Sequence, residues 1–245
     1  MLINKIKYFN KKIIFSLFII TISSIPIKLF FFPYGIPITE DGLLYFRYAI
    51  DTSILGQFPN TPLTNNGWPI LLSIFYSNLN SDNFLDYMTL QRIISISIST
   101  ITIIPVYLLL RRFFNYKYAL LGSILFLFEP RMIQNSFLGI TDSLFILLTT
   151  TTLFLILSSR IKIIYIAFAF AAFTTMVRYE GVILLCLISI LYFIKYRKNK
   201  KELLKYTIAI SIFILIMLPM SYAKINATGS DGIGASVLGG VEVYA

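Results

Sequence analysis

The chain has 245 residues, of which 57% are hydrophobic and 13% are charged, and its mean hydropathy is +0.80. Soluble domains are about half apolar and a quarter charged, so this composition excludes an ordinary soluble domain and predicts an all-α membrane protein. The chain has no histidine and one cysteine, Cys186, which argues against a disulfide framework, a serine-hydrolase triad and a typical zinc site.

About seven apolar runs approach the roughly 20 residues that a membrane-spanning helix needs. The first follows a Lys-rich start, as in a secretory signal, but it is too long and lacks a small-residue cleavage site, so we expect a retained span. We predict transmembrane helices at residues 13–32, 93–110, 113–128, 143–159, 163–177, 182–194 and 208–223. They define a polytopic module over residues 1–225, followed by an external Gly-rich tail over 226–245, which would be the start of further sequence if the chain is a fragment.

The basic residues predict the orientation of these spans, because cytoplasmic loops are enriched in Lys and Arg. Fifteen of the 21 basic residues precede the first span or lie in alternate loops, whereas only Glu202 of the 11 acidic residues shares that side. We therefore predict a multi-pass protein of the plasma membrane with a cytoplasmic N-terminus. The net charge of +10 follows from this topology, so we expect no nucleic-acid partner.

Residues 33–92 form a long first external loop in this topology, and loops of such length are uncommon unless they are functional. Two helices are predicted in it, at residues 39–55 and 68–78, with turn-forming residues between them. Both are apolar on one side and rich in Trp or Tyr, which is typical of helices that lie at a membrane surface. In the first helix, Arg47 and Asp51 form an i,i+4 pair, and the apolar face contains Leu43, Phe46, Ile50 and Ile54.

The residues that could carry chemistry gather in four clusters on the external side. From Lys162 to Glu180 a helix would rise roughly 27 Å, against a hydrocarbon core of about 30 Å. Charges below the membrane surface are costly and usually face a cavity or a partner, so the clusters are functional candidates. The alternative is that each cluster marks a helix end at headgroup level, with Arg131 and Arg178 pairing the nearby acids. The clusters are residues 39–42, residues 129–131 with Asn135, residues 139–142 and residues 178–181.

Residues 39–49, 66–69, 129–130, 139–142 and 178–181 together resemble the motifs of the GT-C class of membrane glycosyltransferases, which includes the dolichyl-phosphate-mannose protein mannosyltransferases. The shared module of that class has about seven spans, so the resemblance covers nearly the whole chain. Its first external loop carries an acidic motif and surface-lying helices, and it faces a cavity that takes a polyprenyl-phosphate sugar. The acidic pair of this chain reads Glu40-Asp41, whereas Asp-Glu is frequent in the mannosyltransferase branch.

The resemblance implies transfer of a sugar from a polyprenyl (dolichyl) phosphate to an acceptor on the external face. Such a transfer needs a carboxylate to take the proton of the acceptor hydroxyl and a positive group to hold the leaving phosphate. Asp41 is the expected base, because the dipole of the helix that starts beside it would keep it ionised, and Glu40 is a second catalytic candidate. The rings of Tyr45 and Tyr48 could stack against the sugar or anchor the helix at the interface.

Arg178 is the first choice for holding the phosphate, with Arg131 and Lys28 behind it. We expect Asp41, Asp142 and an outer arginine to line a common cavity. A divalent metal ion could bind between Asp41 and Asp142, but the sequence does not require one. The remaining candidates for substrate binding are Glu129, Asp142 and Glu180.

Two other classes of protein stay open at this point. A transporter or flippase would use intramembrane acidic residues to line the path of its substrate, although no internal repeat is visible. A scaffold subunit would leave the acidic residues of the loops without a chemical role. For the transferase, the expected partners are the polyprenyl-phosphate sugar donor, membrane lipid, and an acceptor that is a protein, a lipid or a glycan.

Overall fold

The computed structural model describes residues 11–60, 63 and 65–229, and within them it contains helices and no strand. This confirms the prediction of an all-α fold. The helices are α1 (Lys11–Phe30), α2 (Glu40–Leu55), α3 (Gly67–Tyr76), α4 (Phe84–Ile101), α5 (Ile103–Leu110), α6 (Tyr116–Leu127), α7 (Pro130–Leu138), α8 (Asp142–Ile156), α9 (Ile161–Val177), α10 (Gly181–Tyr196), α11 (Lys200–Leu204) and α12 (Tyr206–Thr228).

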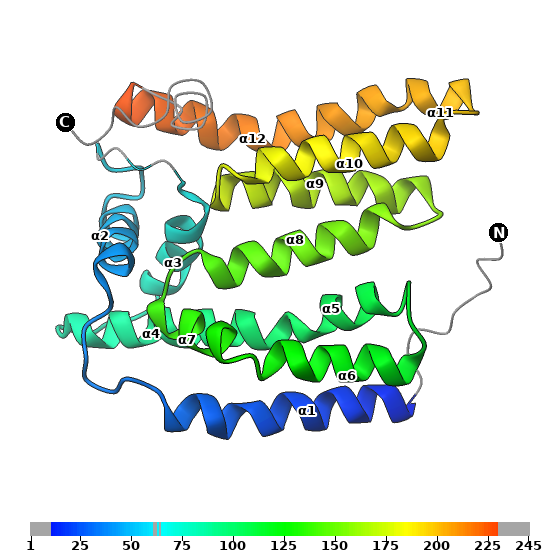
Figure 1. The fold of residues 1–245 in the computed structure, drawn as a ribbon. Coiled ribbons are helices and arrows are strands. Elements are labelled where there is room, and N and C mark those ends of the chain that lie inside the picture. The colour runs from blue at the N-terminus through cyan, green and yellow to red at the C-terminus, as the bar shows by residue number, and fades with distance from the viewer. Residues whose placement is uncertain (1–10, 61–62, 64, 230–245) are drawn as a thin grey trace.

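The apolar helices form one bundle. In Figure 1, α1, the α4–α5 pair, α6, α8, α9, α10 and α12 run side by side across the view, and each of the predicted spans coincides largely with one of them. Three stretches, Lys11–Phe30, Phe84–Leu110 and Lys200–Thr228, are long and apolar enough to cross a membrane, and the other bundle helices are shorter. The chain is thus a helical protein with the composition of a multi-pass membrane protein, while the count of seven crossings stays a prediction.

The second predicted span begins too late in the sequence. Its helix starts at Phe84 rather than at residue 93, because α4 includes Asp86 and Arg92, which lower the local hydropathy without interrupting the helix. Asn83 caps this start, since its side chain accepts a hydrogen bond from the backbone N–H of Leu85. Helical spacing and capping therefore define the start of α4 better than hydropathy does.

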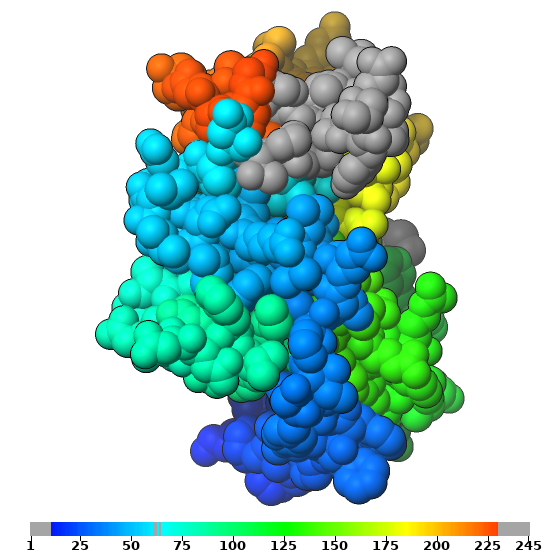
Figure 2. Space-filling model, turned by 90° about the vertical axis from the view of Figure 1, so that its left-hand side faces the viewer, coloured from blue at the N-terminus to red at the C-terminus, as the bar shows by residue number. Residues whose placement is uncertain are grey.

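Both helices predicted in the first external loop are present. Figure 1 shows α2 nearly end-on, so it crosses the direction of the bundle helices at one end of the molecule, and Figure 2 shows it across that face between the ends of α1 and α12. Phe46 is buried against Trp68 and its neighbours, as the apolar pattern predicts. Ile54, on the same predicted apolar face, is 75% exposed. Arg47 and Asp51 are both exposed, and no ion pair joins them among the described residues.

The core consists of three clusters along the bundle. One surrounds Phe168 between α8, α9, α10 and α12, and a second packs α1 against α5 and α6 around Tyr107. The third centres on Trp68, which is fully buried, and joins α2 and α3 to α4. This third cluster fixes the crossing helix α2 on the end of the bundle, where the acidic residues gather.

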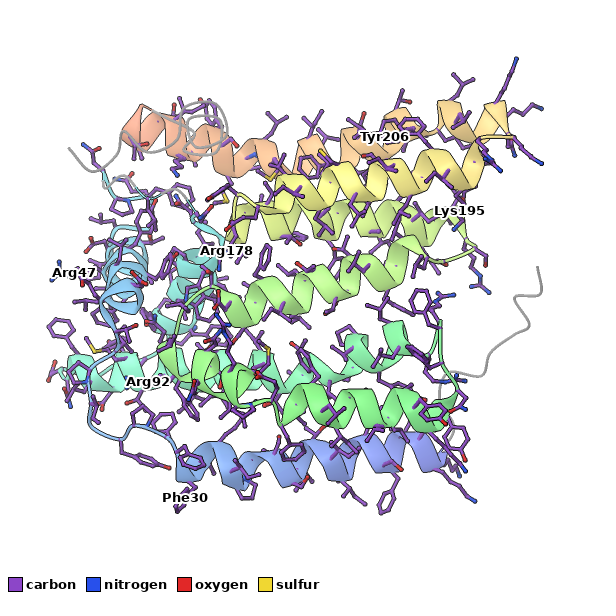
Figure 3. The ribbon with its side chains drawn as sticks, in the orientation of Figure 1. Phe30, Arg47, Arg92, Arg178, Lys195 and Tyr206 are labelled. Atoms are coloured by element: carbon purple, nitrogen blue, oxygen red, sulfur yellow. The ribbon has the colours of Figure 1, made fainter. Side chains whose placement is uncertain are left out.

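The two ends of the bundle differ in charge, as the topology predicts. Figure 3 shows Lys195 towards one end of the bundle and Arg178 towards the other, and the turns around Arg111, Arg160 and Lys198 lie at the Lys195 end. Helix α12 continues to Thr228, beyond the expected start of the tail at residue 226. Gly229 follows this helix, and residues 230–245 of the predicted tail lie outside the described residues.

Cysteine labelling tests the orientation. In a Cys186→Ala background, Asn60→Cys should react with a membrane-impermeant maleimide added from outside, and Lys198→Cys only after the membrane is opened, because the basic turns are expected to be cytoplasmic. Both positions are exposed, and Lys198 is preferred to Asn199, whose side chain caps α11. The reverse labelling pattern would overturn the predicted topology.

Candidate active site

Arg178 is the centre of a charged cluster at the end of the bundle that α2 crosses. It follows α9, and its Nη1 atom lies 2.5 Å from Oδ1 of Asp142, while Nη2 lies 2.9 Å from Oε1 of Glu180. Its Nε atom is 3.5 Å from the second Glu180 oxygen. Arg178 therefore pairs with nearby acids, as the helix-end alternative expects, but one of these acids belongs to a cluster 36 positions earlier in the chain.

Asp142 is fixed on both of its carboxylate oxygens. It begins α8, and its Oδ2 atom accepts a hydrogen bond from Asn135 of α7 at 3.0 Å. The guanidinium group of Arg178 also lies over the ring of Phe145, 5.5 Å from the ring centre. Burial opposes the charge of Arg178, but the contacts with Glu180 and Asp142 outweigh it and raise its pKa. The cluster thus holds one permanent cation between two carboxylates.

Glu129 and Arg131 form no ion pair with the Arg178 cluster within the described residues. Glu129 caps α7, since its carboxylate accepts a hydrogen bond from the backbone N–H of Met132 at 2.7 Å, and Pro130 occupies the first helical turn. Arg131 is exposed, and no ion pair of Arg131 occurs in the described part of the chain. Glu129 therefore has a structural role as a helix cap, and substrate binding by either residue stays a prediction.

Gln91 joins the elements around the cluster, and sequence reasoning did not identify it. Its side-chain amide donates to the carbonyl groups of Gly42 and Gly139, at 3.1 and 2.7 Å, and its oxygen accepts from the hydroxyl of Tyr76. Trp68 donates to the same Gly139 carbonyl at 2.8 Å. Gly139 ends α7 with a φ of +69°, a conformation that favours glycine. The one available signal was a glutamine two positions before the span predicted at residues 93–110.

Arg92 supports the segment that leads into α2. It is 3% exposed, and its guanidinium group donates to the carbonyl groups of Ile36, Pro37 and Phe137 at 2.5 to 2.9 Å. Because these carbonyls come from the chain between α1 and α2 and from α7, one buried cation ties the start of α2 to the helix that precedes Asp142. Arg92 is thus a structural residue at the edge of the site.

Asp41 lies in the first turn of α2 and is exposed. An open hollow beside the first half of α2 is lined by Glu40, Asp41, Leu43, Leu44 and Arg47. Asp142 lines a separate, small cavity between α4, α6, α7 and α8. These two hollows share no lining residue and Arg178 lines neither of them, so a cavity common to Asp41, Asp142 and an outer arginine stays a prediction.

Tyr45 is affected by charges from both clusters of acidic residues. Burial raises the pKa of its phenol, a side-chain hydrogen bond with Thr141 and the charge of Arg178 act in the opposite direction, and the charges of Asp41 and Asp142 raise it further. Tyr45 follows Asp41 by one helical turn, and the charges of Asp41 and Asp142 both act on its hydroxyl. The predicted residues Asp41, Tyr45, Asp142 and Arg178 thus belong to one region of the molecule.

Tyr48 does not have the exposed ring that sugar stacking requires. It is 2% exposed, and its hydroxyl accepts a hydrogen bond from the side-chain amide of Asn66 at 2.7 Å. Burial raises the pKa of its phenol. The prediction that Tyr48 stacks against substrate or anchors α2 at the interface does not fit this burial, because the three residues from Tyr45 rotate the Tyr48 ring by about 300°, into the core beneath α2.

The described residues do not form an evident metal site. No group of three or more histidine, cysteine, aspartate or glutamate side chains that could hold a metal ion occurs among them. Both oxygens of Asp142 accept hydrogen bonds from Arg178 and Asn135, whereas divalent cations such as Mg²⁺ and Ca²⁺ need several free oxygen ligands. The Asp41–Asp142 pair therefore does not fit a divalent ion in this arrangement, and we derive no metal-dependent step.

Gly42 allows α2 to approach α7 closely, and this contact gives a test of how Asp41 is positioned. A Cβ atom at Gly42 would lie 2.7 Å from the carbonyl oxygen of Leu138. Gly42→Ala should therefore lower the free energy of unfolding by about 1–3 kcal/mol, the usual cost of overpacking, and shift α2 away from the cluster. Thermal unfolding in detergent measures this loss.

Gly122→Ala is the matched control for Gly42→Ala. Its Cβ atom would meet the end of the flexible side chain of Leu110 at 2.7 Å rather than backbone, so a small effect is expected. Equal destabilisation by the two substitutions would show that the α2–α7 contact is not specially tight.

Comparison with known proteins gives one match. A family model described as dolichyl-phosphate-mannose-protein mannosyltransferase matches residues 84–222, which is more than half of the chain. The matched range contains Glu129, Arg131, Asp142, Arg178 and Glu180, whereas Glu40, Asp41, Tyr45 and Tyr48 precede it. A search of the curated proteins and a search of the solved structures return no match.

Proposed function

We propose, on the premise that this chain belongs to the dolichyl-phosphate-mannose-protein mannosyltransferase family, that it moves a hexose from a polyprenyl-phosphate donor to an acceptor on the external face of the membrane. Membership of this family makes the chain a glycosyltransferase that depends on a polyprenyl-phosphate sugar, as the sequence motifs predict. The family match favours this function over a transporter or a scaffold. The choice of face rests on the distribution of basic residues.

The reaction forms one bond and breaks one at the sugar. The acceptor oxygen attacks the anomeric carbon, the bond from that carbon to the phosphate oxygen breaks, and the polyprenyl phosphate leaves with the bonding electrons. We assign Asp41 the role of the base that takes the proton of the acceptor hydroxyl. In support, Asp41 is exposed and lies at the edge of a hollow that an acceptor can enter.

The leaving phosphate needs a cation, and Arg178 is the candidate that the geometry favours. Guanidinium carries five N–H donors, of which Arg178 uses three on Asp142 and Glu180. Two donors remain for phosphate oxygens, and 35% of the side chain is exposed. The carboxylates hold the guanidinium plane in one orientation, so it is prepared for the phosphate before the donor binds.

An apolar groove between α1 and α7 suits the polyprenyl chain of the donor. Helix α7 presents Gln134 and Phe137 to this groove and Asn135, the partner of Asp142, to its other side. A lipid chain in the groove would therefore lie one helix away from the charged cluster. The groove is lined by Ile27, Phe31, Pro130, Ile133, Gln134 and Phe137.

Transfer in proteoliposomes tests the proposed function. Purified protein with radiolabelled dolichyl-phosphate mannose should transfer label to a peptide, a glycan or a lipid acceptor, and vesicles without protein should not. The family match over residues 84–222 is the observation that carries this expectation. Transfer from a nucleotide sugar but from no polyprenyl-phosphate hexose would overturn the proposal.

A further inference from the structure

Lys28 is a buried cation that the mechanism above does not use. It lies in the last turn of α1 and is 1% exposed. Its ammonium nitrogen is 3.3 Å from the hydroxyl of Ser99 and 2.9 Å from that of Thr100. No carboxylate within the described residues lies at ion-pair distance from it. An unpaired charge is costly in the interior of a membrane protein, so such a residue normally serves a function.

Ser99 connects Lys28 to the cavity of Asp142. The Ser99 side chain lines that small cavity together with Asn135, Asp142 and Ser143. The cavity has a free volume of about 10 Å³, which is room for roughly one water molecule. Its polar lining residues supply the hydrogen-bond partners that a water needs. Ser99 thus contacts the ammonium group of Lys28 and also lines the cavity that Asp142 lines.

The balance of charge gives this link a role. Asp142 and Glu180 carry two negative charges against the single positive charge of Arg178, so the cluster alone has an excess negative charge. The phosphodiester of a polyprenyl-phosphate sugar would add another. Lys28 is a buried cation in contact with a residue of the Asp142 cavity, and electrostatic interactions are strong where water is largely excluded.

We propose that Lys28 is a positioning residue of the donor site: through Ser99 and a water molecule in the Asp142 cavity, it balances the charge of Asp142 and so lets Arg178 accept the donor phosphate. This inference rests on the proposed function for the identity of the donor. Lys28 itself does not touch the phosphate, because the cavity beside Ser99 is too small for one.

Donor kinetics test the positioning role. Lys28→Met removes the charge but keeps the length of the side chain, so KM for dolichyl-phosphate mannose should rise about tenfold or more, with kcat changing less. The unfolding temperature should stay unchanged or rise, because the buried charge has been removed. Lys28→Arg should restore most of the affinity. Ser99→Val should resemble Lys28→Met, because it removes the connecting hydroxyl.

Two exposed residues provide the controls for these variants. Lys12→Met removes a lysine from the exposed start of α1, and Ser97→Val removes an exposed hydroxyl from α4. Neither should change KM. If Lys28→Met leaves KM at the value of Lys12→Met, or lowers activity only in proportion to a fall in unfolding temperature, Lys28 is structural and the proposal is overturned.

A double-mutant cycle on thermal unfolding tests the link without any transfer assay. Asp142→Asn should lower the unfolding temperature of the wild type by more than it lowers that of the Lys28→Met variant, because only the wild type retains the buried ammonium that Asp142 balances. Additive effects would overturn the proposal even if the enzyme is active. Absence of transfer from dolichyl-phosphate mannose, with this coupling present, would instead count against the proposed function.

Discussion

Asp41→Asn should lower turnover by about 10²–10⁴-fold, the usual contribution of a general base. The substitution keeps the size and hydrogen-bonding shape of the side chain but removes the proton acceptor. Folding should be spared, because Asp41 is exposed and makes no hydrogen bond or ion pair in the described part of the chain. Single-turnover transfer from dolichyl-phosphate mannose measures the effect, and the affinity for the donor should survive.

Asp51→Asn is the matched control, since Asp51 is an exposed carboxylate further along the same helix. It should leave turnover within about twofold of the wild type, as is usual for a surface substitution away from a site. Glu40→Gln distinguishes the two adjacent acids. If Glu40→Gln abolishes turnover and Asp41→Asn does not, the base is Glu40 and the role assigned to Asp41 is wrong.

Arg178→Ala should raise KM for the donor by about 10- to 100-fold, which corresponds to the loss of a charge-assisted hydrogen bond to phosphate. The substitution also leaves Asp142 and Glu180 side by side without their cation, so some loss of unfolding temperature is expected. Arg178→Lys should recover part of the affinity, because it restores the charge but not the two-pronged geometry of guanidinium. Equilibrium binding of dolichyl phosphate separates the loss of affinity from the loss of fold.

Arg131→Ala and Arg160→Ala complete this test. Arg131 is the other arginine predicted to bind phosphate, and it is exposed at the start of α7. Arg160 precedes α9 at the opposite end of that helix from Arg178, so its removal should not affect donor binding. A larger effect on KM from Arg131→Ala than from Arg178→Ala would move the phosphate to α7 and remove the role assigned to Arg178.

Local patterns in the sequence determined the helices and the family. Apolar runs near 20 residues predict bundle helices because the bilayer accepts only segments whose backbone groups are bonded internally. The spacing of Phe46 and its neighbours predicts α2. The second helix of the loop is predicted to start at residue 68, one residue after the observed start of α3 at Gly67. The short acidic motifs predict the mannosyltransferase family, and the family match agrees.

The structure alone decided which of these residues meet. Arg178 pairs with Asp142 across 36 positions, and Lys28 reaches Ser99 across 71. Tyr48 turns into the core while Tyr45 faces the cluster, because three residues of helix rotate the side chain by about 300°. Spacing along a chain describes neighbours on one helix, whereas the pairing of helices depends on how their side chains pack, and that is a property of the whole fold.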